Sequence, residues 1–208
     1  MSDAERTTLE LIHAAAKKEF LEKGFMSASL RSIVKEAGVT TGAFYGYYGS
    51  KEELFEALVS KQYETFMGCY KTAQQDFAKL PPEEQPENMG EISGQCMNDM
   101  LLYAYENPDE FQLLLCCSEG TRFAGMIDEM VEIESKSTHD YQAVLNGLGR
   151  PSPQIDERLE HILITGMFNA FFELIIHRMP LEQAENYLVE LQKFYTAGWM
   201  KIMGQDDL

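Results

Sequence analysis

Residues 30–48 read LRSIVKEAGVTTGAFYGYY, and this stretch decides the fold of the amino-terminal part of the chain. Apolar residues at helical spacing on both sides of Gly38 predict two short helices, over 30–36 and 41–47, joined by a tight turn. Gly38 suits the left-handed conformation that ends a helix, and Thr40 is a good N-cap for the helix that follows. The stretch therefore predicts a helix-turn-helix.

The second of these helices is expected to show one face to solvent. Ile33, Val34, Phe44 and Tyr48 are spaced to pack against a preceding helix at about residues 7–23. This packing leaves small, hydroxyl-bearing and aromatic side chains outside, a composition that suits a DNA groove. These outward residues are Thr41, Gly42, Ala43, Tyr45, Gly46 and Tyr47.

The charge distribution is compatible with DNA as a partner. Taken alone, the net charge of -17 opposes DNA binding, because affinity for a duplex comes largely from cations that neutralise phosphates. Residues 1–61, however, hold eight Lys and Arg against nine Asp and Glu, whereas residues 62–208 hold nine against twenty-five. The acidity lies in the carboxy-terminal part, which would repel DNA and disfavour wrong docking orientations.

Helical spacing of apolar residues continues along the chain, and no alternating strand pattern persists. We expect an all-α protein with a helix-turn-helix DNA-binding domain over 1–50 and a helical ligand-binding and dimerisation domain over 51–208. Capping boxes at Thr7–Glu10 and Ser50–Glu53 predict two helix starts. The later helices are expected at about 51–80, 88–105, 108–118, 123–147, 154–178 and 181–203.

Three linked blocks, FLEKGF at 20–25, AGVTTGAFY at 37–45 and YGSKEELF at 48–55, resemble the head motif of the TetR family in order and spacing. The resemblance implies an amino-terminal three-helix head, a helical bundle body and a two-fold dimer. It also implies that Thr40, Thr41 and Ala43 approach bases. By the same resemblance, phosphates are held by Tyr45, Tyr47 and Lys51, and a base or phosphate by Arg31.

Each of these residues also has a simpler structural interpretation. Tyr45 and Tyr47 could cover the core of the head, and Lys51 could be a solvated cation at a helix start. Thr40 caps the helix in either case. Ala43 and Gly46 are smaller than the contact residues that can occur in the family, so fewer direct base contacts are expected.

Geometry also predicts a homodimer. One short recognition helix covers few base pairs, so a palindromic operator in double-stranded DNA requires two heads about 34 Å apart. The family resemblance assigns the interface to the last two helices, which would form a four-helix seam. The expected interface residues are Ile162, Thr165, Gly166, Asn169, Tyr187, Leu191, Phe194 and Gly198.

The body is rich in Met and aromatic residues, which suit a permissive pocket for a small-molecule effector. Each such residue is also a candidate for ordinary core. Glu173 sits in an apolar run and needs a partner, which is either a ligand or, in the simpler interpretation, His177 one turn on or Arg178 across the dimer. The candidate pocket residues are Met67, Met100, Tyr103, Phe111, Met126, Tyr141, Phe168, Phe172 and Glu173.

Other classes of function have little support in the sequence. The chain lacks the motifs of α/β-hydrolases, P-loop proteins and dinucleotide-binding proteins, so we expect no enzyme, catalytic residue, cofactor or metal. The four cysteines lack CxxC spacing and are expected to be buried, reduced thiols. Asn169 and Glu173 interrupt the longest apolar stretch, 162–176, so a membrane span is not expected and the cytoplasm is the expected location.

The sequence therefore favours a ligand-responsive DNA-binding regulator, a repressor released from its operator by a lipophilic effector. Two alternatives remain at this point. One is a helical-bundle enzyme or carrier for a lipophilic small molecule. The other is a helical dimeric adaptor whose amino-terminal face binds a protein.

Overall fold

The computed structural model describes residues 3–205 of the chain, with side chains from Thr7 onward. Within this range the chain is helical, with no strand, which confirms the all-α prediction. The helices are α1 (Asp3–Ser27), α2 (Leu30–Glu36), α3 (Thr41–Tyr45), α4 (Lys51–Ala78), α5 (Gln85–Glu106), α6 (Pro108–Cys116), α7 (Met126–Gly147), α8 (Glu157–Ile176) and α9 (Leu181–Ile202).

The start of α1 differs from the sequence prediction. The helix begins at Asp3, so Thr7 lies inside it and does not cap it. The predicted end near Gly24 corresponds to a kink, because Gly24 has φ 71° and ψ 164° inside α1. The second predicted start is confirmed, since Glu53 N donates to Ser50 Oγ at 3.1 Å and the Glu53 carboxylate accepts from Gly49 N at 2.7 Å.

The chain divides into two compact units. The head unit takes the chain up to Thr65 together with Asn107–Ala124, and the bundle unit takes Phe66–Glu106 and the chain from Gly125 onward. This division differs from the expected domains, 1–50 and 51–208. The long helix α4 contributes residues to both units, and α6 belongs with the head.

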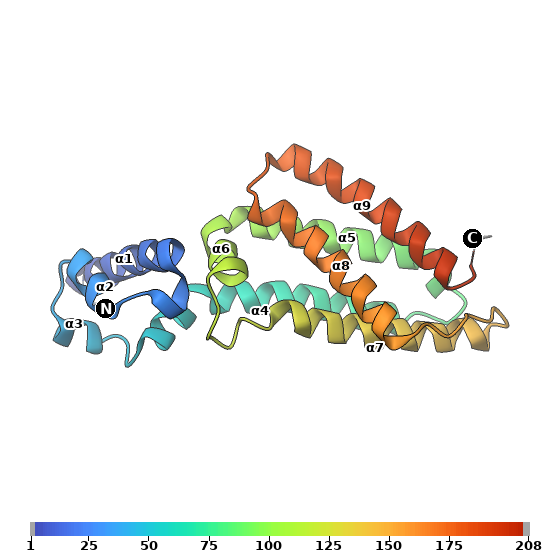
Figure 1. Ribbon diagram of the computed structural model, residues 1–208, viewed down its shortest axis with the longest axis horizontal. Coiled ribbons are helices and arrows are strands. Elements are labelled where there is room, and N and C mark those ends of the chain that lie inside the picture. The colour runs from blue at the N-terminus through green and yellow to red at the C-terminus, as the bar shows by residue number, and fades with distance from the viewer. Residues whose placement is uncertain (1–2, 206–208) are drawn as a thin grey trace. The chain divides into compact units, whose positions relative to one another are not determined.

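The head unit is built around an aromatic core. Phe20 and Phe44 are fully buried, and α1 packs against both α2 and α6 (Figure 1). The ring of Phe55, from α4, lies 5.1 Å from the ring of Phe20 and 5.4 Å from that of Phe25, in edge-to-face geometry. Such pairs add about 0.5–1.5 kcal/mol beyond the burial of their area. They fix the start of α4 against α1.

The segment 107–124 is held to the head by polar and aromatic contacts. Lys17 Nζ lies 2.6 Å from Glu110 Oε1, and Phe25 N donates to the carbonyl oxygen of Cys117 at 2.9 Å. The ring of Phe123 is buried, 5.1 Å from the ring of Tyr63. Two stretches far apart in the sequence therefore share one core.

The bundle unit consists of the rest of α4 with α5, α7, α8 and α9. Helix α8 contacts α5, α7 and α9, and α5 also contacts α9 (Figure 1). Phe66 and Tyr70 on α4 pack against α8, since their rings lie 5.9 Å from that of Phe172 and 5.7 Å from that of Phe168. Helix α8 is thus the core helix of the bundle.

By length and composition alone, α8 could also cross a membrane. It is the one such helix in the described part of the chain, and 39% of its apolar window is buried. Its buried residues, which include Ile164, Phe168 and Phe171, pack within the bundle. This packing is typical of a core helix.

We predict that Phe123→Ala destabilises the protein by about 3–5 kcal/mol, because it removes a buried ring and leaves a cavity. The free energy of unfolding of the full chain in urea, followed by circular dichroism, measures this. The matched control is Leu11→Ala, which truncates a half-exposed side chain of the same unit and should change stability by about 0.5 kcal/mol or less. Equal effects of the two substitutions would contradict the assignment of 107–124 to the head core.

Candidate DNA-binding surface and ligand cavity

Helix α3 has five residues and depends on its surroundings, because helices this short are unstable alone. Thr40 Oγ1 accepts a hydrogen bond from Ala43 N at 3.1 Å and caps its start, as predicted. Phe44 is fully buried and anchors the helix to the head core. Gly38 has φ 67° and makes the turn before the cap, also as predicted.

This anchoring leaves the opposite face of α3 open to solvent. Thr41 and Ala43 are exposed, Tyr45 is 55% exposed, and Tyr47 is partly buried. A Cβ atom at Gly46 would lie 3.2 Å from the carbonyl oxygen of Ala43, so a larger residue there would require a local shift. The structure therefore brings together the α3 residues that the sequence predicted for DNA.

Lys51 has contacts inside the head that the sequence did not indicate. Its Nζ donates to the carbonyl oxygens of Phe25 at 2.6 Å and Ala28 at 3.0 Å, and lies 4.4 Å from the centre of the Phe25 ring. The ammonium group thus joins the start of α4 to the chain that follows the kink in α1. A phosphate contact by Lys51 would compete with these bonds.

Two basic side chains on α2 are available for a phosphate. Arg31 and Lys35 are exposed, lie one turn apart, and form no ion pair with another residue of the described chain. The lysines of α1 are instead engaged with carboxylates, in the pairs Lys17–Glu110, Lys18–Glu36 and Lys23–Glu19. Sequence reasoning named Arg31 and missed Lys35, although the four-residue spacing indicated a shared face.

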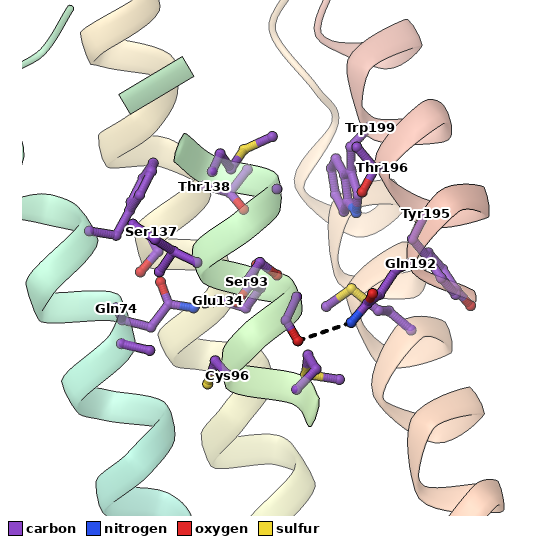
Figure 2. A pocket seen from close by; sticks show the side chains of 18 of the residues that line it. Gln74, Ser93, Cys96, Glu134, Ser137, Thr138, Gln192, Tyr195, Thr196 and Trp199 are labelled. Atoms are coloured by element: carbon purple, nitrogen blue, oxygen red, sulfur yellow. Dashed lines mark hydrogen bonds between the residues drawn. The ribbon is translucent and has the colours of Figure 1, made fainter. Parts of the chain in front are cut away.

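The bundle unit contains a partly open cavity of about 160 Å³ between α4, α5, α7, α8 and α9 (Figure 2). Aromatic side chains make up part of its mixed apolar and polar wall. The aromatic lining residues are Tyr70, Phe77, Tyr141, Phe168, Phe171, Tyr195 and Trp199. All belong to the bundle unit, so one compact body holds the whole cavity.

Figure 2 shows polar side chains on two sides of this cavity, with Gln74 and Glu134 on one side and Gln192 on the other. Glu134 Oε2 accepts hydrogen bonds from Tyr70 Oη at 2.5 Å and Gln74 Nε2 at 2.7 Å. Burial raises the pKa of Glu134, and these two hydrogen bonds oppose that rise. Gln192 donates from Nε2 to the carbonyl oxygen of Gly94 at 3.1 Å.

Two of the predicted pocket residues, Tyr141 and Phe168, line the cavity. Met67, Met100, Met126 and Phe172 are buried elsewhere in the bundle, Tyr103 is partly buried on α5, and Phe111 is buried in the head unit. Glu173 is exposed and pairs with His177 Nε2 at 2.6 Å, which was the simpler of its two predicted roles.

Sequence reasoning named Tyr141 but missed the other polar residues of the cavity. Glu134, Thr138 and Tyr141 all line it from α7, and their spacing of four and three residues places them on one helix face. That spacing was the available signal. Trp199 also lines the cavity and was not predicted.

The predicted interface residues of α8 and α9 are mostly at the surface. Ile162 is 64% exposed and Phe194 71% exposed. Gly166, Asn169, Tyr187 and Gly198 are also exposed, whereas Thr165 and Leu191 are partly buried. Leu191 lines the cavity instead.

The cysteines only partly follow the expectation of buried thiols. Cys96 and Cys117 are buried, but Cys69 is partly exposed and Cys116 exposed, so that expectation was wrong for Cys116. Burial raises the pKa of Cys96, which lines the cavity, to about 12. Its thiol is therefore protonated at neutral pH. No group of three or more metal-binding side chains is found among the described residues.

A capped, outward-facing helix on a compact three-helix platform defines a helix-turn-helix DNA-binding domain. Residues 12–58 match the family model of bacterial regulatory proteins, tetR family. Over the helix-turn-helix and the start of α4, the chain is thus similar to the TetR family of transcriptional regulators.

Three solved structures have a similar fold over nearly their whole length. A transcriptional regulator from Aquifex aeolicus VF5 is 21% identical, with a TM-score of 0.51, over 90% of this chain and 98% of that one. The regulator FadR from Bacillus subtilis, in complex with stearoyl-CoA, is 17% identical, with a TM-score of 0.51, over 88% and 96%. A gamma-butyrolactone receptor, an ArpA-like protein, is 20% identical, with a TM-score of 0.52, over 95% and 100%.

We predict that Lys51→Met lowers the free energy of unfolding by about 1–3 kcal/mol, because buried carbonyl oxygens lose their donor. The matched control is Lys61→Met, at an exposed position of the same helix, with an expected change of about 0.5 kcal/mol or less. Urea unfolding of both variants checks the difference. If Lys51→Met leaves stability unchanged while weakening DNA binding, Lys51 binds a DNA phosphate and does not stabilise the head unit.

Proposed function

We propose that this transcriptional regulator is a cytoplasmic homodimeric repressor that binds a palindromic operator and is released by a small lipophilic effector. The observation that carries this proposal is the outward display of α3, whose only fully buried side chain is Phe44. In the proposed complex, two α3 helices enter successive major grooves on one side of the duplex. An enzyme or carrier that acts only through the bundle would not need this arrangement.

The contacts to DNA divide by chemistry. Thr40, Thr41 and Ala43 lie at the amino end of α3 and are assigned to base edges in the major groove. Phosphates are assigned to the hydroxyl groups of the tyrosines that follow and to the cations of α2. These phosphate-binding residues are Tyr45, Tyr47, Arg31 and Lys35.

The dimer is proposed to form through α8 and α9. Six of the ten large apolar side chains found exposed in the described chain lie between residues 159 and 194. On α8 the exposed stripe contains Ile162 and Gly166, and on α9 it contains Tyr187 and Phe194. Many exposed apolar side chains on two helices that contact each other are typical of an interface, and small residues allow close helix approach.

The cavity is proposed to hold the effector, and continuous chain links it to the head. Helix α4 lines the cavity with Tyr70 and Phe77, and its first part, up to Thr65, belongs to the head unit. Helix α5 also lines it and leads directly into α6, which belongs to the head. A ligand that shifts α4 or α5 would change the spacing of the two heads, and ligand and DNA binding would then oppose each other.

The relatives support a lipophilic effector in general terms. The FadR structure from Bacillus subtilis holds stearoyl-CoA, and the ArpA-like protein is a gamma-butyrolactone receptor. Both ligands are small molecules with an apolar part. The aromatic and aliphatic side chains in the wall of the present cavity suit such a part.

We predict that the protein binds the duplex upstream of its own gene, and that Tyr45→Ala and Arg31→Ala each weaken binding by about 1–3 kcal/mol. Fluorescence anisotropy at several salt concentrations measures this. Arg31→Ala should also reduce the salt slope by about one, as expected for a lost phosphate contact.

The matched control for the DNA experiment is Lys61→Ala, which removes an exposed cation from α4 and should leave the affinity within about twofold. The proposal fails if no genomic fragment binds at low salt. It also fails if Tyr45→Ala and Arg31→Ala bind as tightly as the unmodified protein.

We predict that Ile162→Asp together with Phe194→Asp converts the dimer to a monomer, because each dimer would bury four unpaired carboxylates. Sedimentation analysis measures the mass. The matched control places one aspartate at exposed Ala143 on α7 and should remain dimeric. A double variant that stays dimeric would show that the seam lies elsewhere.

A further inference from the structure

We propose that the effector is a lipophilic cation, bound in the bundle cavity with its positive charge at the carboxylate of Glu134. This inference rests on the proposed function, since it names the chemical class of the ligand that the cavity would take. It is carried by the charge, the aromatic side chains and an unpartnered hydroxyl group in the cavity.

The only ionisable side chain of Asp, Glu, Lys, Arg or His type that lines the cavity in the described residues is acidic. Glu134 lines the wall, and no Lys, Arg or His is found among the described residues that line it. The two hydrogen bonds to Glu134 end on Oε2 and come from neutral donors, Tyr70 and Gln74. Glu134 is partly buried. A carboxylate withdrawn from water without a cation is unfavourable, and a bound cation would offset that cost. A carboxylate or phosphate ligand would instead be repelled.

The aromatic side chains suit the same kind of ligand. Faces of Tyr and Trp attract cations, and this attraction strengthens when the cation is desolvated. Tyr70 is a direct partner of Glu134, and Trp199 faces the cavity from α9 (Figure 2). The apolar part of the ligand would pack against Phe168 and Phe171.

A hydroxyl group provides independent evidence for a polar ligand. Tyr141 is 4% exposed and lines the cavity, and its Oη has no hydrogen-bond partner among the described residues. A buried hydroxyl group without a partner is unfavourable by about 1–3 kcal/mol. Tyr141 lies two turns after Glu134 on α7, so a ligand with polar groups at both ends would satisfy both residues.

The volume limits the size of the ligand. A cavity of about 160 Å³ is close to the engineered cavities of about 150 Å³ that bind benzene. The test probe is benzyltrimethylammonium, whose single ring matches this volume and which adds one fixed positive charge. Its neutral carbon isostere is neopentylbenzene, and phenylacetate supplies the opposite charge.

Trp199 allows a direct measurement, because it is the only tryptophan of the chain and it lines the cavity. We predict that benzyltrimethylammonium changes the fluorescence of the full-length protein saturably. Neopentylbenzene should bind at least about tenfold more weakly, and phenylacetate should give no saturable change. The proposal is overturned if the neutral isostere binds as tightly as the cation, or if the cation gives no saturable change.

Glu134→Gln tests the assigned residue, because glutamine keeps an oxygen acceptor for Tyr70 and Gln74 and loses only the charge. It should weaken binding of the cation at least about tenfold and leave binding of neopentylbenzene within about twofold. The matched control is Glu132→Gln, an exposed carboxylate on the same helix, with affinity unchanged. Equal cation affinity of Glu134→Gln and the unmodified protein would overturn the proposal.

The outcomes separate this inference from the proposed function. If Glu134→Gln fails to fold, the comparison of the three probes on the unmodified protein decides. If the neutral isostere binds best while the protein still binds its operator, the charge assignment is wrong and the regulator function stands. If no genomic DNA binds, the proposed function fails whatever the probes show.

Discussion

The structure depends on one constraint, the burial of Phe44 beneath a helix of five residues. So short a helix does not persist alone, and it is held by its anchor, by the Thr40 cap and by the turn at Gly38. Because Phe44 must face inward, Thr41, Ala43 and Tyr45 face outward. The exposed face that reads DNA in our account is thus a consequence of core packing.

The same dependence on packing extends through the head. The ammonium group of Lys51 satisfies carbonyl oxygens after the kink in α1, and the segment 107–124 completes the aromatic core. Two helices that line the cavity, α4 and α5, are therefore continuous in sequence with parts of the head. This continuity gives a physical basis for opposition between effector and operator, without any contact between the two ligands.

Much of this arrangement was predictable from the sequence. The helix-turn-helix followed from Gly38, Thr40 and the spacing of apolar residues, because local conformation decides them. The role of Lys51 and the membership of α6 in the head depend on contacts between distant stretches, which a single sequence does not show. The cavity was predicted through its apolar residues, but most of those were ordinary core, and the polar residue Glu134 was missed.

The central claim, that the exposed face of α3 reads bases, is tested most directly by selection of binding sites from a pool of randomised duplexes. The unmodified protein and Ala43→Asn would be compared, because asparagine can pair with adenine in the major groove. Our account predicts a palindromic site whose base preference changes at one pair of symmetry-related positions and is retained elsewhere. Identical preferences for the two proteins, at every position, would contradict it.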